Sequence, residues 1–301
     1  MPSSHDLFAA YAEFIPDFTA FCAALQTAPT CCLRVNTLRT TPAVVQAMLR
    51  QQGYHVTPSP LTDELLLVDN LTHPGTLQAA LLGYYYPQAF TSALAALALA
   101  PQAGEMICDL CAAPGSKTSH MAQLMRDQGL IVANDRHDKR LSMLEHNVKR
   151  LGISNIVTTR YPGQNFPLRH KFHRVLVDTP CSGEGNYRWD AQGRLQHYRR
   201  ASGDLPRLQR QLLLRGFDLL TERGTLLYAT CTYNPSENEA VVQTLLEQRS
   251  ATLEPIQLDV PHDSGLQRWK DQTYDRRMAF CWRLYPHHTN SVGFFLARIR
   301  A

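Results

Sequence analysis

The feature that most constrains the fold is the alternation of strand and helix patterns between about residues 105 and 250. Short apolar runs, such as Val175 to Asp178, are separated by longer stretches in which apolar side chains recur at helical spacing. This alternation predicts βαβ units, whose parallel strands share one sheet with helices on both faces. We therefore expect an α/β fold built on a mostly parallel, doubly wound sheet.

Two of the predicted strands lead into a cysteine. The strand ending at Asp178 continues through Thr-Pro to Cys181, and the strand from Gly224 ends at Cys231. Parallel strands present their carboxyl ends at one sheet edge, where ligands bind, and a partly exposed thiol near positive charge can be a nucleophile. Alternatively, Asp178 caps the next turn and the cysteines are small buried side chains. The repetition of the design at two strand ends favours chemistry.

A tight loop of small residues connects the first strand of this region to a helix. After the strand end at Asp109 come Cys111, Ala112, Ala113, Pro114, Gly115, Ser116 and Lys117. Backbone N–H groups in such a loop, and at the start of the helix, can approach the polar atoms of a ligand. The glycine spacing matches neither a P-loop nor G-x-G-x-x-G.

A carboxylate follows at the end of the next predicted strand. Asp135 lies about 20 residues beyond Gly115, a spacing that suits an acid bound to the ribose hydroxyls of a nucleotide-like cofactor. Capping of the next helix is the alternative role. Arg140 comes one helical turn later.

We predict no metal site. Cys108 and Cys111 have the spacing of a redox pair, but Cys108 lies within a strand, and no second pair supplies the remaining zinc ligands. His287 and His288 also lack convincing metal partners in the sequence.

The chain before the α/β region predicts a separate module. Helical spacing over residues 1–25 is followed by a strand from Cys32, a helix from Pro42 to Gly53 and a strand from Leu65. We predict a small α+β module over residues 1–90 and the main domain over residues 91–301. The three tyrosines at 84–86 favour packing at the junction over a base-stacking platform.

Charge is unevenly distributed along the chain. Residues 1–90 hold three Arg against six acids, whereas residues 136–223 hold 17 Lys or Arg against eight acids. Arg suits phosphate contact and base stacking, so a single-stranded nucleic acid is the expected partner, with a solvated basic face as the alternative. The residues expected to hold the strand are Tyr187, Arg188, Trp189, Arg194, Tyr198, Arg199, Arg200, Arg207 and Arg210.

Taken together, the motifs resemble those of the RNA 5-methylcytosine methyltransferases of the NOL1/NOP2/Sun (RsmB/NOP) family. The matching segments are Asp109-Leu-Cys-Ala-Ala-Pro-Gly-Ser-Lys117, Asp178-Thr-Pro-Cys181-Ser-Gly-Glu-Gly, Ala229-Thr-Cys231-Thr-Tyr-Asn-Pro-Ser-Glu-Asn-Glu239 and Tyr285-Pro-His. The resemblance implies a Rossmann-like methyltransferase domain. Arg34-Val-Asn-Thr and Tyr86-Pro-Gln also resemble the N-terminal part of that family, which implies an RRM-like module.

The resemblance also implies roles for individual residues. S-adenosyl-L-methionine would be held by the loop from Cys111 to Lys117, by Asp135 and by Arg140, with Asp178 between cofactor and base. Cys231 would be the nucleophile, and Cys181 would assist product release. The family usually has an Asp near Thr159 that contacts adenine. Tyr161-Pro-Gly stands here instead, so a backbone group or the Asn165 side chain is expected to take over.

These features lead to an expected function. We expect an RNA (cytosine-C5) methyltransferase acting on an unpaired or flipped cytosine of rRNA or tRNA. The alternatives are a methyltransferase for DNA or protein and a non-catalytic RNA-binding assembly factor. Without a signal peptide pattern, a long apolar run or a disulfide framework, we also expect a soluble, cytoplasmic monomer that does not associate with membranes.

Overall fold

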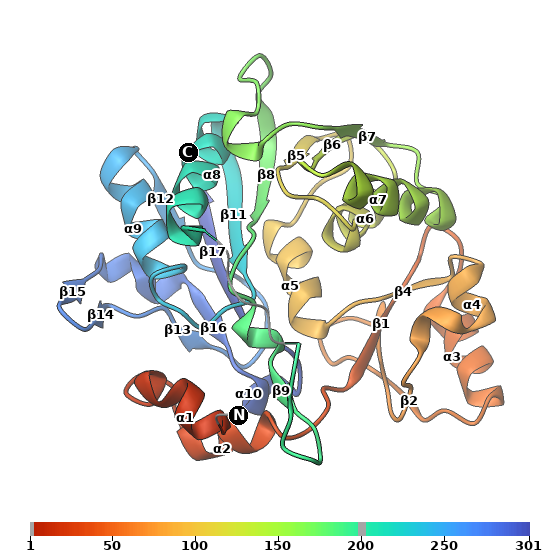
Figure 1. The fold of residues 1–301 in the computed structure, drawn as a ribbon. Coiled ribbons are helices and arrows are strands. Elements are labelled where there is room, and N and C mark those ends of the chain that lie inside the picture. Colours follow the sequence, from red (N-terminus) through yellow and green to blue (C-terminus); the bar gives the residue numbers. More distant parts are fainter. Residues whose placement is uncertain (1–2, 198–202) are drawn as a thin grey trace.

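The computed structural model describes residues 3–197 and 203–301, and a mixed β-sheet dominates it (Figure 1). In spatial order the sheet contains β13 (Asp263–Ser264), β16 (Trp282–Leu284), β17 (Phe294–Arg300), β11 (Leu220–Thr230), β8 (Phe172–Asp178), β5 (Met106–Asp109), β6 (Leu130–Asn134) and β7 (Ile156–Thr159), and β12 (Thr252–Glu254) also pairs with β17. The strands from β11 to β7 are parallel, and β17 runs antiparallel to β11. The predicted mostly parallel sheet is confirmed.

Helices cover both faces of this sheet. One face carries α5 (Phe90–Leu99), α6 (Ser116–Leu124) and α7 (Asp138–Leu151), and the other carries α8 (Leu205–Asp218) and α9 (Glu239–Gln248). Side chains of β8 alternate between the two layers: Val175 and Val177 join the cluster under α8 and α9, and Leu176 joins the cluster under α5 and α6. A strand buried on both sides needs a continuous apolar run, which explains its sequence.

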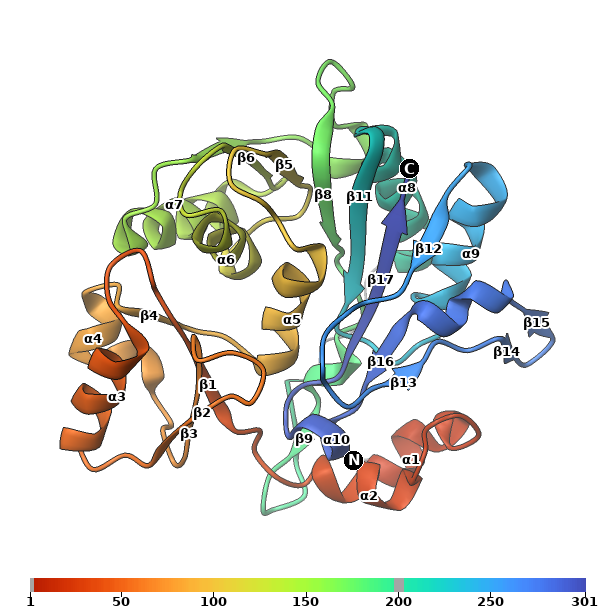
Figure 2. The ribbon, with the colours of Figure 1, turned by 180° about the vertical axis from the view of Figure 1, so that it is seen from behind.

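A second, smaller sheet precedes this domain (Figure 2). Its elements are β1 (Cys31–Val35), α3 (Pro42–Gln51), β2 (Val56–Pro58), β3 (Leu65–Val68), η2 (Pro74–Thr76), α4 (Gln78–Leu81) and β4 (Tyr85–Pro87). The antiparallel strand order β2-β3-β1-β4 with two helices is the ferredoxin-like βαββαβ arrangement. The predicted small α+β module is confirmed, whereas the division at residue 90 stays a prediction.

The tyrosines at the end of this module pack, as predicted. Tyr85 and Tyr86 are buried, and the ring of Tyr86 lies under the guanidinium groups of Arg34 and Arg150. Arg34 is itself buried and donates to the backbone oxygen of Ser116 at the start of α6. The two sheets are therefore joined by a polar contact next to the predicted ligand loop.

The first residues of the chain lie far from this module. Helices α1 (Ser4–Phe8), η1 (Ala9–Tyr11) and α2 (Phe18–Ala24) lie beside α10 (Pro286–Thr289) (Figures 1 and 2). Phe8 and Phe21 form an aromatic cluster with Tyr233 and Tyr285. The N-terminal segment thus covers the far end of the large domain.

The remaining elements are short. They are η3 (Gly163–Asn165), η4 (Glu184–Asn186), β9 (Arg188–Trp189), β10 (Leu195–Gln196), β14 (Arg268–Trp269), β15 (Gln272–Thr273) and η5 (Arg276–Phe280). Among residues 3–197 and 203–301, no helix is long and apolar enough to cross a membrane.

Candidate active site

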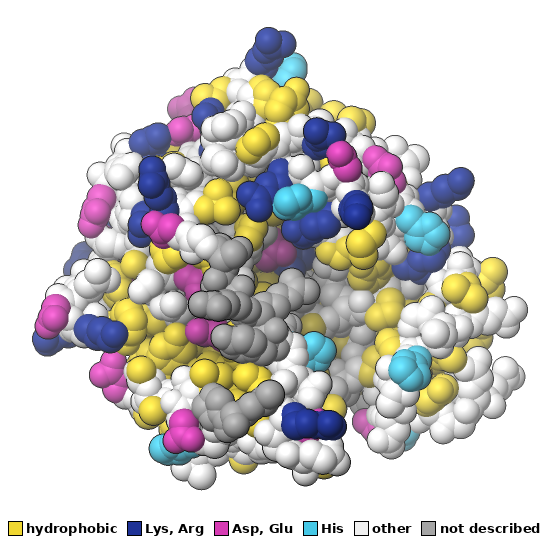
Figure 3. All heavy atoms as spheres, in the orientation of Figure 1, with side chains coloured by type: hydrophobic (Ala, Val, Ile, Leu, Met, Phe, Trp, Pro, Cys, Tyr) yellow, Lys and Arg dark blue, Asp and Glu magenta, His cyan; other side chains and the backbone are white. Residues whose placement is uncertain are grey.

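A cleft of about 840 Å³ opens at the carboxyl ends of the parallel strands. The predicted site residues that line it are Cys111, Pro114, Lys117, Arg140, Asp178, Cys181 and Cys231. Lys and Arg side chains gather above the central hollow in Figure 3, over α7 and the loop before it. The structure therefore places these residues from different strand ends in one cleft.

The two cysteines meet because their strands are parallel neighbours in register. Ala229 of β11 lies opposite Asp178 of β8, so the residues that follow the two strands emerge side by side. The sulfur atoms of Cys181 and Cys231 are 3.3 Å apart. All eight cysteines of the chain are free thiols.

The two thiols differ in their acidity. A hydrogen bond from Cys181 lowers the pKa of Cys231 below its ordinary value, outweighing burial and the charge of Asp178, with further help from Lys117 and Asn186. That same hydrogen bond, together with burial, raises the pKa of Cys181 well above the ordinary range. Either sulfur can donate this hydrogen bond, and the position of Cys231 next to the Lys117 ammonium favours Cys231 as the more acidic thiol of the pair.

An ion pair lies next to the thiols. Lys117 Nζ is 2.8 Å from Asp178 Oδ2, and it also lies 5.1 Å from the ring centroid of Phe294. Burial alone would lower the pKa of Lys117, but the charge and hydrogen bond of Asp178 raise it above its ordinary value. The cleft thus holds a fixed ammonium group beside the more acidic thiol.

Hydrogen bonds tie the two cysteine turns together. The hydroxyls of Ser182 and Thr232 are 2.7 Å apart, and Thr232 also donates to Glu184. Glu237 accepts from the backbone N–H of Ser182 at 2.9 Å. Since each turn contributes a partner to the other, neither thiol can move far by itself.

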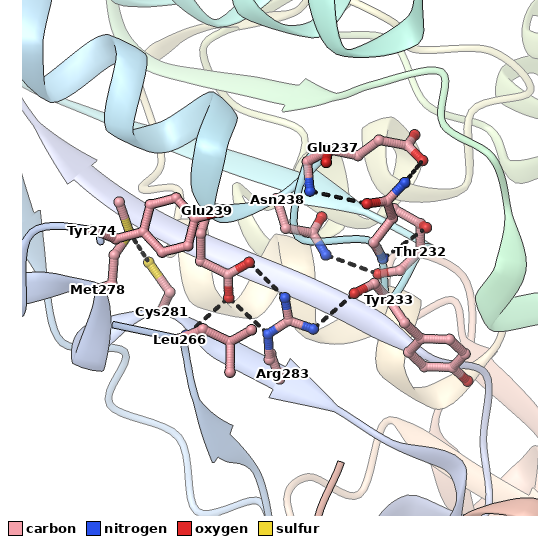
Figure 4. A network of polar contacts seen from close by, with 12 residues as sticks. Thr232, Tyr233, Glu237, Asn238, Glu239, Leu266, Tyr274, Met278, Cys281 and Arg283 are labelled. Atoms are coloured by element: carbon pink, nitrogen blue, oxygen red, sulfur yellow. Dashed lines mark hydrogen bonds and ion pairs between the residues drawn. The ribbon is translucent and has the colours of Figure 1, made fainter. Parts of the chain in front are cut away.

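A buried ion pair supports the turn that carries Cys231 (Figure 4). Arg283 and Glu239 are 2% and 0% exposed, with Nη2 and Oε2 2.5 Å apart. Arg283 also donates to the backbone oxygen of Tyr233, and Asn238 donates to that of Thr232. The guanidinium group donates both to the carboxylate and to a backbone carbonyl. The carbonyl groups of a buried turn that has no regular secondary structure need such donors.

The loop after β5 is held by its own polar contacts. Asp109 is buried, accepts from the hydroxyl of Thr118 at 2.7 Å, and has its pKa raised by burial to about 7. Gly115 has φ of 101°, and a Cβ there would approach Leu144 Cγ to 3.3 Å. Only glycine adopts this backbone conformation at little cost, so α7 can pack close against the loop.

Asp135 and Arg140 lie beside that loop. Asp135 is buried and accepts from the backbone N–H of His137 at 3.0 Å, and Arg140 Nη1 lies 3.5 Å from its carboxylate. Arg140 also donates to the backbone oxygen of Ala113. The predicted loop, acid and arginine therefore form one connected structure.

A narrow slot of about 100 Å³ adjoins the cleft on the side of Asp135. Gln164 lines this slot, whereas Asn165 lines a separate hollow on the outer side of α8. Asn165 is therefore not among the residues that line the slot, and the alternative of a backbone group as the adenine contact stays a prediction. The short helix η3 turns that residue outward.

The predicted strand-holding run is wrong in its central part. Tyr187 and Trp189 are buried and join the aromatic cluster of the N-terminal segment. Arg188 is buried too, and it donates to the backbone oxygens of Gly185, Tyr187 and Ser291. These side chains hold the chain together and are not free to stack on bases.

The described outer members of that run are more exposed than its central part. Arg194 pairs with Asp190 on the surface, Arg207 is exposed on α8 and Arg210 is half-buried. Three predicted members, Tyr198, Arg199 and Arg200, lie outside the described residues.

Some site residues were not identified from sequence. Phe294 and Asn186 line the cleft, and Glu184, Glu237 and Arg283 organise the cysteine turns. Charged residues at 184, 237 and 239 close behind the two cysteines were a usable signal. The partner Arg283 lies 44 residues beyond Glu239, and no local pattern connects them.

The fold and the site define a doubly wound α/β protein with a paired-thiol cleft next to a ligand slot. A family model described as 16S rRNA methyltransferase RsmB/F matches residues 96–300, and a model of the RsmF/B-like ferredoxin-like domain matches residues 7–73. The chain therefore belongs to the RsmB/F methyltransferase family.

Individual relatives agree with this assignment. The chain is 32% identical to the tRNA (cytosine(49)-C(5))-methyltransferase of Pyrococcus abyssi over 89% of its own length and 87% of the relative's length. It is 36% identical to the human 28S rRNA (cytosine(4447)-C(5))-methyltransferase over 89% of its own length, but it spans only 34% of that protein. A solved methyltransferase homologue from Pyrococcus horikoshii superposes with a TM-score of 0.84 at 29% identity, covering 98% of this chain and 94% of that one.

Proposed function

We propose that the protein is an S-adenosyl-L-methionine-dependent RNA (cytosine-C5) methyltransferase that acts on rRNA or tRNA through a covalent bond from Cys231 to C6 of cytosine. The observation that carries the proposal is the pair of thiols 3.3 Å apart beside the Lys117–Asp178 ion pair. The relatives' names, which describe cytosine-C5 methyltransferases of rRNA and tRNA, support the reaction and the substrate class.

The acidity of Cys231 suits this reaction. C5 of cytosine is a poor nucleophile, and addition of a thiolate at C6 moves electron density to C5. The lowered pKa of Cys231, caused first by the hydrogen bond that it shares with Cys181, increases the fraction of this thiol that is ionised. Asp178 can accept from the amino group of the base, and Lys117 places a positive charge where the ring gains electron density.

Cys181 suits the last step. After methyl transfer, the C5 proton must leave and the bond to Cys231 must break. Cys181 has a raised pKa and lies within hydrogen-bonding distance of Cys231, so it can stabilise the departing thiolate. A single thiol would lack this donor.

The residues beside the cleft fit the cofactor. The buried carboxylate of Asp135 can accept from ribose hydroxyls, and the loop from Cys111 to Lys117 presents small side chains and the start of α6. The slot and the cleft share Cys111 and Arg140 in their linings, so one ligand can extend from Asp135 to Asp178. When bound, S-adenosyl-L-methionine supplies an electrophilic sulfonium methyl group.

RNA access is limited because the reactive thiol lies within a cleft. Cys231 lines that cleft and is half-buried, so a base stacked in a duplex cannot reach it, and the target cytosine is unpaired or flipped. Exposed basic residues at the start of α7, such as Arg136 and Lys139, can contact phosphates.

We also propose a cytoplasmic, monomeric enzyme. The cytoplasmic location agrees with the eight free thiols.

The test is a trapping experiment with Cys181→Ala. The variant is incubated with S-adenosyl-L-methionine and total cellular RNA and then run on a denaturing gel. We expect a slowly migrating, RNase-sensitive band, because Cys231 loses one source of its acidity but keeps Lys117 and can still attack, whereas it is released poorly. Sequencing the trapped RNA identifies the substrate and the cytosine.

Two controls make the result specific. The band must vanish in Cys181→Ala/Cys231→Ala, and Cys31→Ala must behave as wild type because Cys31 lies in the smaller sheet. If Cys231→Ala still methylates RNA, the assigned roles are wrong. If wild type transfers no methyl group to any RNA, the non-catalytic alternative replaces the proposal.

A further inference from the structure

The slot beside Asp135 is lined by both apolar and polar side chains, as a site for the faces and the edge of a base requires. The apolar residues are Leu110, Pro180, Leu208 and Leu212, and the polar residues are Asp135, Arg136, His137, Arg140 and Gln164. Asp135 and Arg140 contact each other, and Arg140 also contacts the loop from Cys111 to Lys117. Among the residues that line the slot, Gln164 is the one with an uncharged amide side chain.

The backbone around Gln164 is held in place, whereas its amide is not. Arg215 donates from Nε to the backbone oxygen of Gln164 at 2.9 Å. A Cβ at the neighbouring Gly163 would come within 2.6 Å of Leu212 Cδ2, so the turn lies directly against α8. Within residues 3–197 and 203–301, the half-buried side-chain amide of Gln164 forms no hydrogen bond. Gln164 also borders the hollow that contains Asn165, so both directions are open to its side chain.

We propose that the Gln164 amide recognises the edge of the adenine base of S-adenosyl-L-methionine, an inference that rests on the proposed function. Adenine presents an amino donor beside the N1 acceptor. A glutamine amide presents one acceptor and one donor group at matching spacing, so it can make both contacts at once. A carboxylate at this position could only accept.

A neutral amide has a further consequence for specificity. When it rotates by half a turn, its donor and acceptor exchange places. Hypoxanthine presents the reversed pattern, with the O6 acceptor beside the N1–H donor. The slot therefore accepts S-inosylhomocysteine nearly as well as S-adenosylhomocysteine, and Gln164 contributes equally to both.

The experiment is calorimetric titration of the full chain with S-adenosylhomocysteine and with S-inosylhomocysteine. For wild type, we expect dissociation constants for the two ligands within about threefold of each other. Gln164→Met keeps the length of the side chain but removes both polar contacts. It should therefore raise the dissociation constant of each ligand by about tenfold. Gln164→Glu keeps an acceptor but loses the donor, so it should also raise both dissociation constants. Asn165→Met is the matched control and leaves both constants unchanged.

The outcomes separate the inference from the function on which it rests. If wild type binds S-adenosylhomocysteine and Gln164→Met binds it equally well, Gln164 only packs and the inference is overturned, while the proposed function stands. If wild type rejects the inosyl ligand by more than about 100-fold, a fixed acceptor reads the base and the inference is again overturned. If wild type binds neither ligand, the proposed function fails with it.

Discussion

The turns after β8 and β11 are built alike and yet differ in chemistry. Each follows a parallel strand, each carries a cysteine, and Ser182 and Thr232 connect them by a hydrogen bond. Nevertheless, the thiol pKa is raised at Cys181 and lowered at Cys231. The comparison teaches that the position after a strand brings a thiol to the cleft, whereas its hydrogen bonds and neighbouring charges decide whether it ionises.

The strongest test of this difference replaces each thiol by serine. Cys231→Ser should reduce methyl transfer by at least about 10⁴-fold, because the attacking atom is lost. Cys181→Ser keeps a hydroxyl that can donate to Cys231, so this variant should complete one turnover, and it should then stall because the thiol that assists release is lost. Rapid-quench measurement of transferred methyl groups distinguishes a missing first turnover from a missing second one. Equal loss of the first turnover in both variants would contradict the division of roles.

A second test removes the support that the Cys231 turn has and the Cys181 turn lacks. Arg283→Met leaves Glu239 buried without its partner and should lower the free energy of unfolding by about 3–5 kcal/mol. The control is Arg249→Met, which breaks the partly exposed pair with Asp218 and should cost less than about 1 kcal/mol. Urea denaturation monitored by tryptophan fluorescence measures both. Similar losses would mean that burial of the pair is unimportant.

The smallest expected effect concerns the charges around Cys231. Lys117 lowers its pKa and Asp178 raises it, so Lys117→Met should shift thiol ionisation to higher pH and Asp178→Asn to lower pH. Because the thiolate is the form that reacts, Lys117→Met should slow the alkylation of Cys231 and Asp178→Asn should speed it at a given pH below the pKa of the thiol. The pH profile of iodoacetamide labelling, read by mass spectrometry at Cys231, reports these changes. Shifts in the same direction in both variants would show that Asp178 and Lys117 do not act through their charges.

Much of this architecture could be predicted from sequence because it is encoded locally. A buried parallel strand requires an apolar run, and its polar end must face the ligand edge, so Asp109, Asp135 and Asp178 could be placed without coordinates. The thiol pair followed from two such ends. Its spacing of 3.3 Å did not, because it depends on the register between β8 and β11.

The differences between expectation and structure have two physical causes, one distant and one local. Tyr187, Arg188 and Trp189 have the composition of a nucleic-acid surface, but their partners include Phe8 and the backbone oxygen of Ser291, both more than 100 residues away. Asn165 is turned outward by a single short helix, η3. Contacts between distant segments decide which polar and aromatic side chains remain available, and periodicity within a segment carries no information about them.

The N-terminal segment has a consequence for biosynthesis. Phe8 and Phe21 pack against Tyr233 and Tyr285, so these contacts cannot form until the segment that carries both tyrosines has been synthesised. Contacts of such high sequence separation form late in folding, so this aromatic cluster assembles after the local elements of the chain. Until then the nascent chain presents an unpaired aromatic surface, and a nascent chain that ends before Tyr233 would offer that surface to chaperones.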